Sequence, residues 1–152
     1  MRRPVLFCAS VAFVAALTSC TADPASNSPR EFAERFIAAE TKAWSTGSLD
    51  DLQALERDDV VFHLPGLDLT GWKAHADYIL EARPMLTNLK QDWTYLAGEG
   101  SVFALGYKSS AIVGSPDGGA PATLSVNYLC VVRLAEGKVA EVWMNGASAT
   151  AP

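Results

Sequence analysis

Basic residues, histidine and cysteine are all scarce in this chain, and it has no apolar run of membrane-spanning length. It contains 12 Lys and Arg residues against 17 Asp and Glu, with no basic cluster, two histidines and three cysteines. An acidic chain without a basic patch repels phosphate backbones, which argues against a nucleic-acid partner. The histidines and cysteines lack zinc-like spacing, so we predict no metal and no cofactor. The apolar run from Pro4 to Leu17 is shorter than the ~20 residues that span a bilayer.

The first residues have the layout of a secretory signal peptide. Arg2 and Arg3 form a basic start, the apolar run follows, and Leu17-Thr18-Ser19-Cys20 ends it. This ending resembles the lipobox of bacterial lipoproteins, in which the cysteine is lipidated and becomes the first mature residue. The resemblance implies a signal peptide over residues 1–19, a lipid on Cys20, and a cell-envelope domain outside the cytoplasm. Two or three acyl chains anchor a protein stably, so we expect the lipid alone to hold it at the membrane.

The rest of the chain predicts one domain of the α+β class. Residues 20–29 are small, polar and proline-containing, as in a flexible tether; residues 30–147 form the domain, and 148–152 a disordered tail. Apolar residues at three- and four-residue steps predict three helices. The first covers residues 29–46, the second is short and follows Ser48 as its N-cap, and the third covers residues 72–85. Alternating apolar residues predict strands over 60–64, 91–97, 102–113, 122–134 and 139–145. Helices first and then a long antiparallel sheet are typical of α+β proteins.

Two segments of the domain together form a family pattern. One runs from Trp44 to Leu52 (WSTGSLDDL) and continues from Asp58 to Gly66 (DDVVFHLPG); the other runs from Gly137 to Trp143 (GKVAEVW). Their order and spacing resemble the nuclear-transport-factor-2-like superfamily, most closely its SnoaL-like (polyketide-cyclase-like) branch. The resemblance covers nearly all of residues 30–146. It implies a cystatin-like cone, in which a strongly bent antiparallel sheet wraps around three N-terminal helices and encloses a mostly apolar pocket. Because this fold hosts enzymes, binding proteins and dimerisation modules, it does not decide the function.

Ketosteroid isomerases of the same superfamily have three catalytic positions, and this chain departs from all of them. Their general base falls at Leu64, directly before Pro65, and leucine cannot accept a proton. Their oxyanion tyrosine falls at Glu40, and their neutral aspartic acid at Cys130. The epoxide hydrolases of this fold use an Asp-Arg-Asp relay that the predicted strands do not supply. We therefore predict neither of these activities.

Glu141 and Glu40 are the candidate catalytic residues. A two-residue hairpin at Glu136-Gly137 places Glu141 opposite Val132 on the covered face of the sheet, where lost hydration raises a carboxyl pKa. A bulge in this hairpin would turn Glu141 into solvent instead. For Glu40, the family resemblance implies a side chain that faces the pocket, and a solvated helix glutamate is the alternative. His63 is expected at the rim or surface, with a pocket base as the alternative.

Aromatic side chains and one asparagine are the candidate ligand contacts, with ordinary core packing as the alternative for the aromatic residues. The candidates are Trp44, Trp72, Tyr78, Trp93, Tyr107, Tyr128, Trp143 and Asn145. Cys130 is expected to be a small buried hydrophobe rather than a nucleophile, because no basic residue lies near it in sequence.

Three functions remain open at this point. The first is binding of a small, largely apolar molecule in the cone. The second is an acid–base enzyme of isomerase, cyclase or hydrolase type, with Glu141 or Glu40 as proton carrier. The third is a non-catalytic module that forms a homodimer or docks an envelope partner through the open sheet face. The first two require an open cavity with one of the glutamates on its wall. The third requires tryptophans to fill that cavity and the exposed face of the sheet to be apolar.

Overall fold

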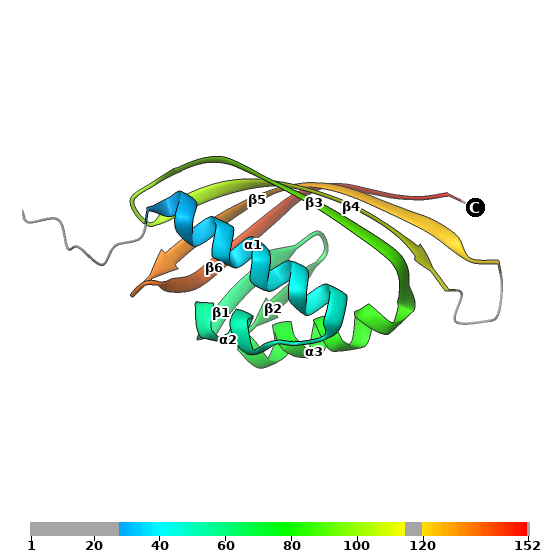
Figure 1. The fold of residues 1–152 in the computed structure, drawn as a ribbon, viewed down its shortest axis with the longest axis horizontal. Helices are drawn as coiled ribbons and strands as arrows, with labels where there is room; N and C mark the ends of the chain where they lie inside the picture. Colours follow the sequence, from blue (N-terminus) through cyan, green and yellow to red (C-terminus); the bar gives the residue numbers. More distant parts are fainter. Residues whose placement is uncertain (1–27, 115–119, 152) are drawn as a thin grey trace, which may run out of the picture.

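The computed structural model describes residues 28–114 and 120–151 of the chain. Its elements are α1 (Pro29–Thr46), α2 (Asp50–Leu55), β1 (Glu56–Leu64), β2 (Leu67–Thr70), α3 (Trp72–Ala82), the 3-10 turn η1 (Arg83–Met85), β3 (Leu86–Glu99), β4 (Val102–Val113), β5 (Ala122–Ala135) and β6 (Lys138–Ala151) (Figure 1). Within these ranges, no helix combines the length and apolar character needed to cross a membrane. The predicted signal peptide, the lipidation site Cys20 and nearly all of the tether lie outside the described residues.

The strands of the described residues form one six-stranded sheet in the order β2-β1-β6-β5-β4-β3. Strands β3 to β6 pair as an antiparallel meander that arches over α1 and α3, which confirms the predicted α+β class (Figure 1). The sheet is not antiparallel throughout, because β1 and β6 run parallel. Parallel neighbours need a long connection, and here everything from β2 to β5 separates the two strands.

The arch of the sheet follows from irregularities in its longest pairing. The register between β3 and β4 shifts between Thr87 and Lys90, and again between Tyr95 and Ala97. Asn88, inside the first shift, has a positive φ of 53°. An extra residue in one strand increases the local twist and bends that strand. We therefore attribute the curl of the sheet over the helices to these two positions.

Helix α1 begins and ends where the sequence predicts. Ser28 and Glu31 form a capping box: the Glu31 N–H donates to the Ser28 hydroxyl at 3.3 Å, and the Ser28 N–H donates to the Glu31 carboxylate at 2.8 Å. At the other end, Gly47 takes the left-handed conformation with φ of 81°, and its N–H donates to the Ala43 carbonyl. The buried side of this helix carries Phe32, Phe36 and Ala43, and Glu40 is on the same side.

Two stretches that were not predicted as strands belong to the sheet. Leu67–Thr70 forms β2 beside β1, and residues 148–151 continue β6 along the start of β5. The predicted disordered tail is therefore wrong for 148–151, because the long neighbouring strand offers partners for its backbone groups. Ser48 was also wrong as a cap, since α2 begins at Asp50 without a side-chain cap.

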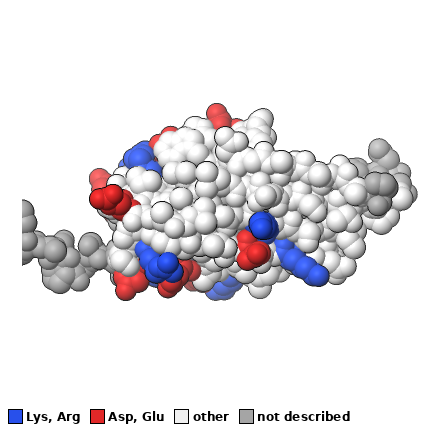
Figure 2. Space-filling model, turned by 90° about the horizontal axis from the view of Figure 1, so that it is seen from above, with Lys and Arg blue, Asp and Glu red and all other residues white. Residues whose placement is uncertain are grey.

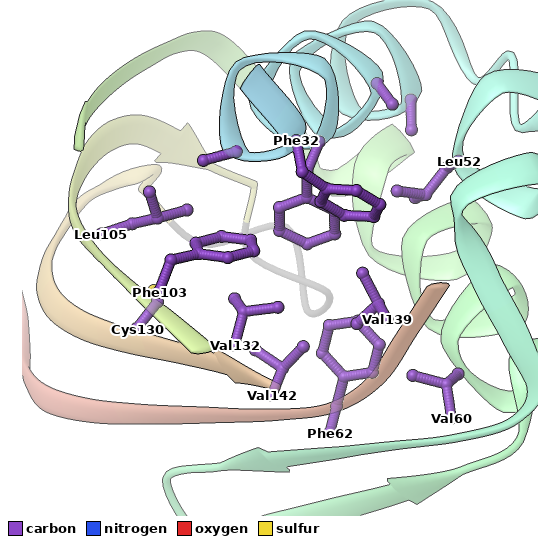
Figure 3. Close-up of a cluster of buried hydrophobic side chains, with 14 of the residues drawn as sticks. Phe32, Leu52, Val60, Phe62, Phe103, Leu105, Cys130, Val132, Val139 and Val142 are labelled. Carbon is purple, nitrogen blue, oxygen red and sulfur yellow. The ribbon is translucent and has the colours of Figure 1, made fainter. Parts of the chain in front are cut away.

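The hydrophobic core lies between the first half of α1 and one half of the sheet (Figure 3). Its larger buried side chains are Phe32, Phe36, Leu52, Val60, Phe62, Leu69, Ile79, Phe103, Leu105, Val132, Val139 and Val142. Cys130 belongs to the same cluster, and burial raises the pKa of its thiol to about 12, so it is the buried hydrophobe that was predicted. The core does not extend under the other half of the sheet, and that is where the candidate site lies.

Candidate functional site

A cavity of about 440 Å³ lies beyond the core, between the second half of α1, helix α3 and the inner face of β3 to β6. Its wall is mostly apolar. Leu67, Met85 and Ser148 are part of this wall and are exposed, so the cavity is open to solvent.

Five of the predicted ligand contacts line this cavity: Trp44, Tyr78, Trp93, Tyr107 and Tyr128. Tyr107 is directly opposite both Trp93 on β3 and Tyr128 on β5, so three rings stand side by side on the inner face. The ring centroids are 4.1 Å apart for Trp93 and Tyr107 and 6.5 Å apart for Tyr107 and Tyr128. Trp44 and Tyr78 meet edge to face at 6.0 Å where α1 and α3 approach each other. The cavity is thus bounded by aromatic side chains from two helices and three strands.

Glu40 lies on the cavity wall and is almost fully buried, as the family resemblance implied. The indole N–H of Trp44, one helical turn further on, donates to Glu40 Oε2 at 3.2 Å. The pKa of Glu40 is raised from 4.5 to about 7, and burial is the largest cause; His75 and the Trp44 hydrogen bond act to lower it, and Glu56 acts to raise it. A carboxyl group with this pKa can gain or lose a proton at neutral pH.

His75 also lines the cavity, with Glu56 behind it. Its Nε2 lies 3.8 Å from Glu40 Oε1, and its Nδ1 lies 3.1 Å from both carboxyl oxygens of Glu56. Burial lowers the pKa of His75 and raises the pKa of Glu56 to about 9. At pH 7, therefore, Glu56 is a neutral acid and His75 a neutral imidazole.

This protonation fixes which nitrogen of His75 holds the hydrogen. The neutral Glu56 donates its O–H to Nδ1, so Nδ1 is an acceptor and the proton is on Nε2. Nε2 is the nitrogen that faces Glu40. The cavity wall therefore presents an N–H donor next to a carboxyl group that exchanges protons near pH 7.

The same three residues are close enough to bind a metal ion. One donor atom each from Glu40, Glu56 and His75 lies within 4.8 Å of the other two. The sequence prediction of no metal rested on cysteine and histidine spacing, which does not detect two glutamates around one histidine.

Sequence reasoning missed the role of His75 and missed Glu56 entirely. A signal existed for His75, because it lies four residues before the inward-facing Ile79 on α3, on the same side of the helix. No signal existed for Glu56, which precedes the strand predicted to begin at Val60. Its partner is 19 positions away in sequence, and only the folded chain brings the two together.

Glu141 lies on the opposite face of the sheet and does not reach the cavity. The two-residue hairpin forms as predicted, but Ala140 is an extra residue in β6, so Glu141 pairs with Arg133. This bulge reverses the facing of every later residue in the strand. On the outer face, Arg133 donates to Glu141 at 2.8 Å and His63 Nε2 lies 3.0 Å away, and these contacts lower the pKa of Glu141.

Three predicted ligand contacts do not line the cavity. The bulge at Ala140 turns Trp143 and Asn145 outward, and the Trp143 ring stacks on His63 with centroids 5.7 Å apart. Trp72 packs edge-on against His75 at 6.3 Å, outside the cavity wall. His63 itself is on the outer surface, in keeping with the surface interpretation.

An arched sheet that encloses an apolar cavity with helices defines the class of α+β cone to which this fold belongs. The chain belongs to the SnoaL-like domain family, whose sequence profile matches residues 33–142. The family resemblance inferred from the sequence is thereby confirmed.

Solved structures with the same fold include three that are informative. A candidate polyketide cyclase from Xanthomonas campestris pv. campestris is 18% identical, covering 76% of this chain and 92% of that one, with a TM-score of 0.62. IdmH, a candidate polyketide cyclase from Streptomyces antibioticus, is 17% identical, covering 82% and 92%, with a TM-score of 0.62. A protein of ketosteroid isomerase-like fold from Catenulispora acidiphila, solved in complex with trimethylamine, is 16% identical, covering 74% and 85%, with a TM-score of 0.60. At these identities the likeness shows the fold alone. Among curated proteins, the comparison found no match.

Proposed function

We propose that this domain binds a small, largely apolar molecule in its cavity. The observation that supports this most directly is the mostly apolar cavity of about 440 Å³, on whose wall Glu40 and His75 lie side by side. Apolar pockets of about 300–1,000 Å³ with a few convergent polar groups are typical of small-molecule sites. The apolar wall provides affinity, and the pair Glu40–His75 orients one polar group of the ligand.

The open cavity favours binding over a purely structural role. A non-catalytic module would need tryptophans to fill this space, whereas Trp44 and Trp93 form its wall. The outer face of the sheet exposes Leu129 and Trp143, and its middle shows few charged side chains when seen from above (Figure 2). A homodimer through this outer face therefore stays a prediction, compatible with a ligand on the inner face.

Acid–base catalysis is the second candidate, and the pKa of Glu40, about 7, favours it. An ionised Glu40 can take a proton from a C–H or O–H group of the bound molecule. The N–H of His75 can then donate to the oxygen on which negative charge develops. Return of the proton from Glu40 to another atom of the ligand completes an isomerisation or cyclisation without any further reactant. The likeness to candidate polyketide cyclases supports this type of reaction, and the trimethylamine complex makes small amines a second class of ligand to test.

For the location of the protein, we propose export and anchoring by a lipid on Cys20. The support is the sequence of residues 1–20 alone: two arginines, an apolar run and Leu17-Thr18-Ser19-Cys20. The net charge of the chain without Arg2 and Arg3 is −7, from 10 basic and 17 acidic residues. A chain of this charge gains no attraction from an anionic membrane, so the lipid would have to hold it there.

Native mass spectrometry of the protein purified from its own host in mild detergent tests these proposals together. We expect the wild type and Glu141→Gln to retain the same small molecule, because Glu141 lies on the opposite face of the sheet. Glu40→Gln should retain the same molecule at lower occupancy if the domain only binds, and a different, unconverted molecule if Glu40 transfers a proton. The mass of the intact chain reports whether Cys20 is acylated.

A folded wild type that never retains or binds a small molecule would contradict the ligand-binding function. Glu40→Gln with unchanged ligand and occupancy would contradict any role of this carboxyl. A chain that keeps residues 1–19 and an unmodified Cys20 would contradict the anchor without affecting the other two conclusions.

A further inference from the structure

The charged side chain of the cavity wall is acidic. Among the described residues that form it, none is a lysine or arginine, and Glu40 is the acidic one. His75 is neutral at pH 7, because burial lowers its pKa. Glu40 is therefore the group on this wall that can present a formal charge to a ligand, and that charge is negative.

Aromatic side chains from several elements line the same cavity as this carboxyl group. The indole of Trp44 holds Glu40 Oε2 through its N–H, and the Tyr78 ring packs against the same indole. On the sheet side, Tyr107 and Tyr128 line the same cavity with their rings 6.5 Å apart. The face of an aromatic ring is the negative end of its quadrupole and attracts a cation, most strongly away from water.

We propose that the ligand of this cavity is an apolar amine, whose ammonium group pairs with Glu40 inside the aromatic wall of Trp44, Tyr107 and Tyr128. The proposal rests on the small-molecule function above and names the class of molecule bound. A buried carboxylate is unfavourable unless an opposite charge accompanies it, and an ammonium group supplies that charge. An anion at the same position meets repulsion from Glu40.

A neutral ligand with a carbonyl oxygen is the competing class. It would accept a hydrogen bond from a protonated Glu40, or from the buried indole N–H of Trp93, which has no partner among the described residues. The two classes depend on opposite states of Glu40, since the amine needs the ionised carboxylate and the carbonyl is favoured by the protonated acid. Their pH dependences therefore differ in direction.

Between pH 6 and pH 8, Glu40 is the group of this cluster that changes charge, since its pKa is about 7. Of the groups that face it, Glu56 on β1 has a pKa of about 9 and Cys130 on β5 one of about 12. Burial raises the pKa of Tyr107 on β4 and lowers that of His75 on α3, so both stay neutral. The ionised fraction of Glu40 rises about tenfold over this range.

Three probes of equal size separate the classes: N,N-dimethylphenethylamine, benzylacetone and hydrocinnamate, which present an ammonium, a carbonyl and a carboxylate on the same phenylethyl group. Titration of the full-length protein is followed by calorimetry and by the fluorescence of its tryptophans, two of which lie in the cavity wall. At pH 8 we expect the amine to bind at least about tenfold more tightly than benzylacetone, and hydrocinnamate most weakly. Lowering the pH to 6 should weaken the amine about tenfold and should not weaken benzylacetone.

Glu40→Gln keeps the size of the side chain and should abolish both the preference for the amine and its pH dependence. Glu34→Gln, on the exposed side of the same helix, should leave both unchanged. If Glu40→Gln does not fold, the three probes on the wild type decide the matter by themselves. Benzylacetone binding as tightly as the amine at pH 8 would overturn the amine proposal and leave the small-molecule function standing. Failure of all three probes to bind the folded wild type would overturn both.

Discussion

The two histidines of this chain lie on opposite faces of one sheet, and each sits between two carboxyl groups. On the inner side, His75 lies 3.1 Å from Glu56 and 3.8 Å from Glu40. On the outer side, His63 lies 3.0 Å from both Asp68 and Glu141. The distances are similar, but the pKa of His75 is lowered and that of His63 is raised.

Solvent exposure explains why the pKa values of the two histidines shift in opposite directions. The His63 side chain is 34% exposed, against 5% for His75. Outside, solvent stabilises the charged forms, and the hydrogen bonds that the His63 ring donates to Glu141 and Asp68 are the largest influences on its pKa. Inside, loss of solvent is the largest influence on the His75 pKa. The same residue types therefore form an ion pair on the surface and a set of neutral, proton-exchanging groups in the cavity wall.

The largest expected effect is a stabilisation by Glu56→Gln. At pH 9 the unfolded chain has an ionised Glu56, and folding must either protonate this carboxyl or bury its charge. Glutamine has no such requirement, and its amide can still donate to His75 Nδ1. We expect Glu56→Gln to raise the free energy of unfolding at pH 9 by at least about 3 kcal/mol, measured by urea denaturation.

Glu141→Gln is the matched control on the outer face. It removes a partner of Arg133 and His63 in a solvated position, so it should lower the free energy of unfolding by less than about 1 kcal/mol. If both substitutions destabilise the protein equally, Glu56 is ionised in the folded state and the contrast between the two faces is wrong.

The next effect is a loss of stability of the wild type as pH rises from 7 to 9. The pKa of Glu56 is about 9 in the folded state, above its ordinary 4.5, so the folded chain holds a proton that the unfolded chain has lost. The associated stability is complete below pH 4.5 and is lost as pH rises through the folded-state pKa. We expect a decrease of about 2 kcal/mol between pH 7 and 9 by thermal or urea denaturation.

The other titrating groups do not reverse this loss of stability between pH 7 and 9. The lowered pKa of His75 affects stability only below pH 6.5, and the lowered pKa of Glu141 affects it only below pH 4.5. The pKa of Glu40 adds a loss in the same direction, largely complete by pH 7, and the raised pKa of His63 also acts in that direction. Glu56→Gln should flatten the profile from 7 to 9, and a wild type whose stability is constant or increases there would contradict the buried neutral acid.

Local patterns in the sequence were sufficient to predict the frame of the fold. The capping box at Ser28 and the glycine at Gly47 fix α1 because each end is determined by neighbouring residues. Alternation along residues 122–134 placed Tyr128 and Cys130 on the covered face, since a strand has a side-chain period of two. Features that are determined by residues close together in sequence could therefore be predicted before the structure was known.

The candidate site was only partly accessible, for two physical reasons. No glycine or other feature of the composition marks the bulge at Ala140. This single extra residue places Glu141, Trp143 and Asn145 on the outer face of the sheet, opposite to the face predicted for them. The contacts of His75 with Glu40 and Glu56 join a helix, a second helix and a strand, and no local pattern reports that convergence. Of the two candidate glutamates, Glu40 was placed by the family resemblance. For Glu141 the sequence left two alternatives, and the folded chain has the one with a bulge, which turns this side chain away from the cavity.

The smallest expected effect is also the most direct test of the contrast between the faces. NMR titration of the two imidazoles should give His63 a pKa above the ordinary 6.5 and His75 a pKa below it. Glu141→Gln should lower the pKa of His63, because it removes the strongest hydrogen-bond partner of the charged ring, and should leave His75 unchanged. The converse substitution, Glu56→Gln, should leave His63 unchanged. Coincident titration of both rings in the wild type would mean that water reaches His75, and in that case neither the neutral His75–Glu56 pair nor the pKa of Glu40 near 7 could hold.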